Sequence, residues 1–177
     1  MVDLAEIQTA YYMAAATGVV VAAIYYMISL RYNMKAREME ICRWFTADYT
    51  SEEAVQRFGI VATMEWKDDK DFMTKYGYSN PEMLAKWVSQ FFAYETGGIL
   101  LRSKVVKADI LYALGGFSAV WSWEKYKDII QNRRDTAWGQ GYMSNAEFFI
   151  QEMLKIGLRT DPSFKDKLET FRRTLKP

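Results

Sequence analysis

The stretch from Thr9 to Leu30, TAYYMAAATGVVVAAIYYMISL, contains no charged residue and is followed directly by Arg31. At about 1.5 Å per residue, a helix of this length covers roughly the 30 Å hydrocarbon thickness of a bilayer. No other part of the chain runs as far without a charge. We therefore expect a single transmembrane helix over 9–30, preceded by a short N-terminal tail over 1–8.

The flanks of this span predict its orientation. Only the acidic Asp3 and Glu6 precede it, whereas the basic residues Arg31, Lys35 and Arg37 follow it. Because the basic end of a membrane helix stays in the cytoplasm, we expect a single-pass protein of the cell membrane with its N-terminus outside. Tyrosines favour the headgroup level, so we expect the membrane lipids to contact these basic residues and the tyrosines at both ends of the span. The tyrosines are Tyr11, Tyr12, Tyr25 and Tyr26.

Two other interpretations of the apolar stretch are weaker. A secretory signal peptide has a basic start and a shorter apolar core, whereas this chain starts with acidic residues and has a longer one. A core helix of a globular protein usually keeps a polar face, and this stretch has none.

Small residues recur at every fourth position of the span, at Ala10, Ala14, Gly18 and Ala22. They form one narrow strip along a helix, and such strips let two membrane helices approach closely. Alanine and glycine are also common in membrane helices without this purpose. The strip predicts contact with another transmembrane helix, from either a second copy or a different subunit of a membrane complex.

Composition excludes several classes of function. The chain carries 23 Lys+Arg, 22 Asp+Glu and no histidine. Positive and negative charges are so evenly balanced that the chain has no basic stripe for binding nucleic acid. The lack of histidine excludes the commonest general base and histidine-based zinc sites. Cys42 is the only cysteine, and no glycine pair has the spacing of a phosphate-binding loop. We expect no cofactor, no metal and no nucleic acid partner.

The remainder is expected to be all-α, because no stretch alternates with a period of two. The membrane helix should continue past Arg31 to Phe45, and a cytoplasmic domain of about five to six helices should occupy 31–160, followed by a C-terminal helix or tail over 161–177. Capping boxes predict helix starts at Thr50, Ser79 and Ser144.

Other signals predict breaks and ends. The charged run 67–71 suggests a solvated face or loop. Gly97-Gly98 should end or kink one helix, Gly115-Gly116 should close a short one, and Gly157 should end a later one. The segment 99–106 fits either a helical turn or an extended piece.

Two charges fall where an apolar stripe predicts hydrophobic residues. Glu95 follows Leu84, Val88 and Phe91 on one helix, and Arg133 follows Ile130 on another. A buried charge without a partner costs several kcal/mol, so we expect a Glu95–Arg133 ion pair joining the two helices. A functional pocket, or Arg134 in the role of Arg133, is the alternative.

Three stretches carry a family resemblance: MEWKDDKDFMTKYG over 64–77, FFAYETGGILLRSKVV over 91–106 and LYALGGFSAVWSWEKYKDIIQNRRD over 111–135. Together with the N-terminal span, they resemble a family of bacterial and archaeal single-pass membrane proteins defined by a domain of unknown function. The resemblance implies the topology and the helical fold, and it implies no activity. Its most specific residues are Trp66, Asp71, Phe72, Tyr76, Gly77, Glu95, Gly98, Trp123, Glu124 and Arg134.

Three functions remain open. The favoured one is a membrane-anchored interaction or scaffold protein, as an accessory subunit of a larger membrane complex. The second is an enzyme that uses the carboxylates of Glu95, Asp109 or Glu124 as general acid or base. The third is a membrane-surface sensor that binds lipid through the basic residues after the span.

Overall fold

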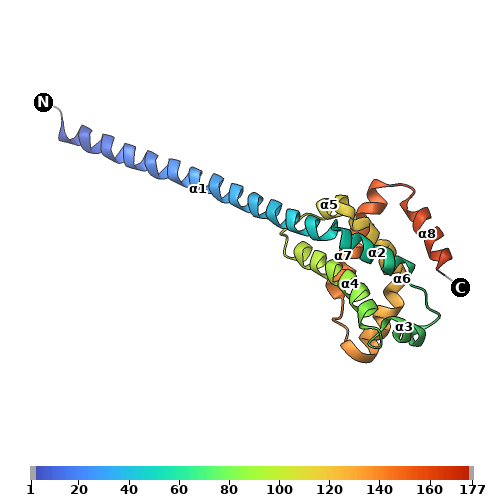
Figure 1. Cartoon of the computed structure of the whole chain (residues 1–177). Coiled ribbons are helices and arrows are strands. Elements are labelled where there is room, and N and C mark those ends of the chain that lie inside the picture. The colour runs from blue at the N-terminus through green and yellow to red at the C-terminus, as the bar shows by residue number, and fades with distance from the viewer. Residues whose placement is uncertain (1–2, 176–177) are drawn as a thin grey trace. The chain divides into compact units, whose positions relative to one another are not determined.

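The computed structural model describes residues 3–175, and within that range the chain is all-α, with no strand (Figure 1). The chain divides into two units, Met1–Arg43 and Trp44–Pro177, which are described separately. The predicted fold class is therefore confirmed.

Helix α1, Leu4–Tyr49, contains the predicted span and its predicted continuation in one uninterrupted helix. Its first turn is capped by Asp3, whose carboxylate accepts from the backbone N–H of Ala5 at 3.1 Å. Within the described residues, α1 is the one helix long and apolar enough to cross a membrane, and no residue of its most apolar segment is buried.

The second unit begins with two short helices, α2 (Glu52–Thr63) and α3 (Asp69–Tyr76). The N-cap of α2 is Ser51, which accepts from the N–H of Ala54, so the prediction of a start at Thr50 was wrong by one residue. Thr50 instead donates its hydroxyl proton to the carbonyl of Thr46. Helix α3, which the sequence did not predict, begins inside the charged run 67–71, and Lys67 and Asp68 of that run form an exposed loop before it.

Helix α4, Pro81–Arg102, is capped by Asn80, with Pro81 at its first position, so the prediction of a start at Ser79 was wrong by one residue. It passes through Gly97 and Gly98 without a break, which corrects the prediction that they end or kink it. Their role is close packing: a Cβ on Gly98 would lie 1.9 Å from the carbonyl oxygen of Asn145, and one on Gly97 would lie 2.9 Å from the Phe149 ring. Helix α4 therefore packs unusually closely against the helix that contains Asn145 and Phe149.

Gly115 separates two helical segments, because it has a φ of 102°, which a residue with a Cβ rarely adopts. Gly157 does not end its helix as predicted. It lies inside the helix, where the ring of Phe164 packs against it and a Cβ would approach that ring to 2.9 Å.

The remaining elements are α5 (Ala108–Leu111), the π-helical turn η1 (Tyr112–Gly116), α6 (Phe117–Arg133), the π-helical turn η2 (Arg134–Trp138), α7 (Ser144–Thr160) and α8 (Phe164–Thr174).

Aromatic side chains dominate the core of the second unit. Helices α4, α6 and α7 surround it, and α3 contributes Phe72, whose ring lies 5.4 Å from that of Trp87. Two buried hydroxyls find partners inside: Tyr126 donates to the carbonyl of Val61 at 2.6 Å, and Tyr94 lies 3.0 Å from the hydroxyl of Ser122. The fully buried rings are Phe72, Trp87, Phe91, Tyr94, Tyr126 and Phe149.

Candidate functional site

A shallow groove follows the predicted strip of small residues on α1. Ala14, Gly18 and Ala22 lie along it, and a Cβ on Gly18 would meet no atom within 4 Å. Thr17 also lines it, but its hydroxyl donates to the carbonyl of Met13 at 2.8 Å and is already satisfied within the helix. Ala10 lies on the same helix beyond the groove lining. The helix thus presents backbone at its surface along this face.

The residues expected at the membrane interface are all exposed on α1. None of them is packed against another part of its unit. They are Tyr11, Tyr12, Tyr25, Tyr26, Arg31, Lys35 and Arg37.

The predicted Glu95–Arg133 ion pair was wrong. Arg133, on α6, pairs with Asp69 at the start of α3. Glu95, on α4, accepts from the side-chain amide of Asn145 at 2.8 Å and from the backbone N–H of Ala146 at 2.7 Å. Each charge does find a partner, as the apolar stripes required, but helical periodicity gives only the face of a side chain and not the element opposite it.

Arg134 does not take the role either. Its guanidinium is buried and donates to Glu147 at 2.8 Å and to the carbonyl of Tyr142 at 2.8 Å. Glu147 is thereby drawn away from the capping box expected at Ser144, and α7 has no side-chain cap of its own. The carboxylate of Glu95 caps α7 from outside, so α4 and η2 together hold the start of α7.

The carboxylates considered as catalytic groups are all engaged. Asp109 forms an exposed ion pair with Arg159. Glu124 accepts from Arg172 at 2.7 Å and from Lys127 at 2.9 Å. The Arg172 hydrogen bond lowers the pKa of the Glu124 carboxyl more than its burial raises it, so this group is ionised at neutral pH and unsuited to donate a proton.

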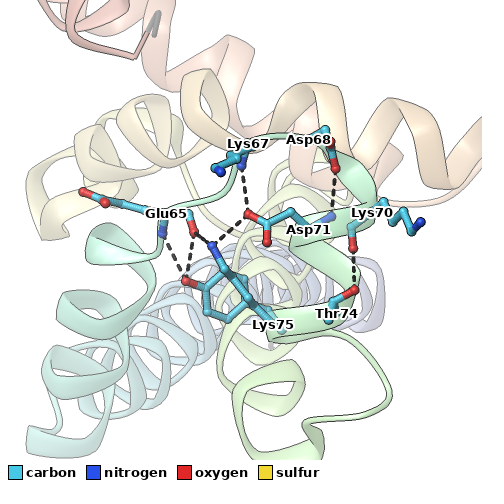
Figure 2. A network of polar contacts seen from close by, with 8 residues as sticks. Glu65, Lys67, Asp68, Lys70, Asp71, Thr74 and Lys75 are labelled. Atoms are coloured by element: carbon cyan, nitrogen blue, oxygen red, sulfur yellow. Dashed lines mark hydrogen bonds and ion pairs between the residues drawn. The ribbon is translucent and has the colours of Figure 1, made fainter.

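The stretch between α2 and α3 forms a polar network of its own (Figure 2). Asp68 caps α3 by accepting from the N–H of Asp71 at 2.8 Å, and Asp71 in turn accepts from the N–H of Lys67 at 3.0 Å and from Lys75 at 2.8 Å. The Lys75 hydrogen bond is the main cause that lowers the pKa of Asp71. Lys75 also donates to the carbonyl of Glu65 at 3.3 Å, so these charges fasten the loop to the helix.

No group of His, Cys, Asp and Glu side chains among the residues that the structure describes could hold a metal ion. The acidic residues of the α3 network, Asp68 and Asp71, hold the loop and the start of α3 through their hydrogen bonds.

A pocket of about 190 Å³ lies within the second unit, between α2, α4 and the start of α6. Its polar lining comprises Arg57, Gln90, Tyr49 and Ser118. The tyrosine and serine hydroxyls lie 2.9 Å apart, and the Arg57 Nε donates to the Gln90 Oε1 at 3.4 Å.

The sequence patterns above did not predict this pocket. A signal was present, because Arg57 lies between Ala54 and Val61 on the apolar face of α2, and Gln90 lies between Trp87 and Phe91 on α4. A polar side chain on such a face marks either a buried pairing or a site. The sequence does not reveal which residues of other helices lie opposite.

Comparison of the chain with protein-family models, with curated proteins and with solved structures found no match. The family resemblance of the three motifs therefore stays a prediction. Assignment of function depends on the geometry of the chain itself.

Proposed function

We propose that the chain is a single-pass membrane protein whose apolar helix packs against another transmembrane helix, and that it serves as an interaction or scaffold subunit of a membrane complex. The observation that carries this proposal is the groove on α1. It runs along the apolar segment of α1, in which no residue is buried. In lipid, close backbone approach at small residues is a main source of helix association.

The state of the carboxylates supports a binding role over a catalytic one. Glu95 caps a helix, and Asp109 and Glu124 are held in ion pairs. Within the described residues, each of the three has a structural partner that stabilises the fold. A general acid or base needs instead a group poised to exchange a proton with a substrate.

The proposal is tested by placing bulk in the groove. Gly18→Ile fills it while adding hydrophobicity, so membrane insertion should be unaffected and the helix contact should be lost. Ala16→Ile adds similar bulk to a residue that does not line the groove, and it serves as the matched control. Cross-linking and co-purification from solubilised membranes should show partner loss for the first variant only. An unchanged pattern for Gly18→Ile would count decisively against this interface.

The proposal includes the orientation, with the acidic N-terminus outside and the second unit in the cytoplasm, on the strength of the positive-inside rule. Protease added to intact cells should then leave the second unit whole, and it should digest that unit once the membrane is permeabilised. Digestion from the outside would overturn the orientation without affecting the helix contact.

A further inference from the structure

The pocket beside Arg57 combines one cation with an apolar wall. Arg57 is half-buried on α2, and Phe58 of the same helix lines the pocket with Phe117, the first residue of α6. Val55 and Phe117 are also well exposed, at 61% and 47%. Large apolar side chains therefore lie at the surface beside the pocket, where their exposure to water is unfavourable.

Arg57 differs from four other arginines of the second unit. Arg133, Arg134, Arg159 and Arg172 each pair with a carboxylate. Among the side chains that the structure describes, no carboxylate oxygen lies within 4.0 Å of the Arg57 guanidinium. Within the described part of the chain, its one hydrogen bond is donated to the side-chain amide oxygen of Gln90, a neutral group 3.4 Å away. A partly desolvated guanidinium gains most from an anion with two oxygens in its plane.

The rest of the polar lining suits the same group. Gln90 is buried, with 2% of its surface exposed, and is held beside the guanidinium. Burial raises the pKa of Tyr49, against the smaller effects of its hydrogen bond to Ser118 and of the charge of Arg57. The Tyr49 hydroxyl therefore keeps its proton at neutral pH, and no negative charge in the lining opposes an anion there.

We propose that this pocket binds a small organic acid, whose carboxylate pairs with Arg57 and whose apolar body lies against Phe58, Val55 and Phe117. A cavity of about 190 Å³ is smaller than the roughly 300–1,000 Å³ of pockets for drug-sized ligands. The body of the acid is therefore limited to about one ring or a short chain. This binding does not depend on the helix contact of α1.

The test uses the full-length protein in nanodiscs of uncharged lipid, with binding followed by ligand-observed NMR and isothermal titration. Phenylacetate carries both features of the ligand, 2-phenylethanol keeps the ring without the charge, and acetate and phosphate keep the charge without the ring. Phenylacetate should bind at least tenfold more tightly than any of the other three. If acetate or phosphate binds as tightly as phenylacetate, the pocket is a general anion site and the proposal is overturned. The proposal is also overturned if phenylacetate does not bind.

Variants then locate the binding. Arg57→Gln should weaken phenylacetate at least tenfold, whereas Arg102→Gln, which alters an exposed arginine outside the pocket, should leave it unchanged. Equal binding by Arg57→Gln would refute the assignment. Phe117→Glu provides a second variant should Arg57→Gln misfold, because this side chain is half-exposed and its carboxylate would repel the ligand while the helix is retained. Undiminished binding by a folded Phe117→Glu would also refute it.

Discussion

The side-chain amide of Asn145 donates to the Glu95 carboxylate across 2.8 Å, although 50 residues separate the two in the chain. The second carboxylate oxygen accepts from the N–H of Ala146 at 2.7 Å. A negative charge at the start of a helix both satisfies free N–H groups and opposes the helix dipole. Glu95 therefore acts as the N-terminal cap that α7 lacks in its own sequence.

We expect Glu95→Ala to lower the free energy of unfolding by about 1–2 kcal/mol, the usual cost of a lost cap. Glu95→Gln keeps an acceptor but loses the charge, so it should cost less, about 0.5–1 kcal/mol. Thermal unfolding followed by circular dichroism in detergent measures both. Asp128→Ala is the control, because that side chain is exposed in the middle of α6. Equal effects at positions 128 and 95 would contradict the capping role.

Gly98 allows the cap to form, because it lets α4 approach the start of α7. A Cβ at this position would lie 1.9 Å from the backbone oxygen of Asn145, which cannot rotate away. We expect Gly98→Ala to destabilise the protein by about 2–3 kcal/mol through overpacking. Gly59→Ala, in α2, meets nothing within 4 Å and should instead stabilise it by about 0.5–1 kcal/mol. If both substitutions shift the melting temperature in the same direction, the contact between Gly98 and the backbone of Asn145 is not tight.

These two residues show what the sequence could and could not predict. The apolar stripe of α4 correctly indicated that Glu95 needs a partner. The sequence then paired it with Arg133, because both were charges on apolar faces, and no local pattern revealed that a helix N-terminus lies nearer. Gly97 and Gly98 were predicted to end or kink α4, because the sequence does not show that α7 packs against them.

Signals confined to one segment succeeded more often. The all-α class, the long N-terminal helix and the place of Pro81 in the first turn of α4 all follow from residues close together in sequence. Helix α3 was missed although its cap, Asp68, is local, because the surrounding charges mask its short apolar face. The Arg57 pocket was not predictable, since it depends on how three separate helices meet.

The pair Glu124–Arg172 should make the attachment of α8 sensitive to acid. The folded protein lowers the pKa of Glu124, chiefly through Arg172, from an ordinary value of 4.5. The stabilisation is therefore fully present above pH 4.5 and is lost as the pH falls through the folded pKa. The neighbouring Asp161, whose pKa is lowered to about 2, chiefly by the Ser163 hydroxyl, stays ionised over most of this range.

Hydrogen exchange of the α8 amides, compared between the wild type and Glu124→Gln at each pH, measures this effect. At about pH 6 the variant should exchange faster, by an amount equivalent to about 0.5–1 kcal/mol, as expected for a partly exposed ion pair. The difference should shrink as the pH is lowered below 4.5. If the difference in exchange rate persists at the lowest pH, the substitution does not act through the charge of Glu124. It would instead disturb the packing of Phe171 on Trp121, whose ring centroids lie 5.0 Å apart.

The corrected pairing of Arg133 can be tested by double-mutant cycles. The Arg133 side chain is 14% exposed and that of its partner Asp69 is 30% exposed, so solvent screens the pair only in part. Asp69→Ala and Arg133→Ala should each destabilise the protein, and their coupling energy should be about 1 kcal/mol. The cycle of Glu95→Ala with Arg133→Ala should give a clearly smaller coupling, because these two side chains bind different partners. A larger coupling for Glu95 than for Asp69 would restore the pairing that periodicity alone predicted.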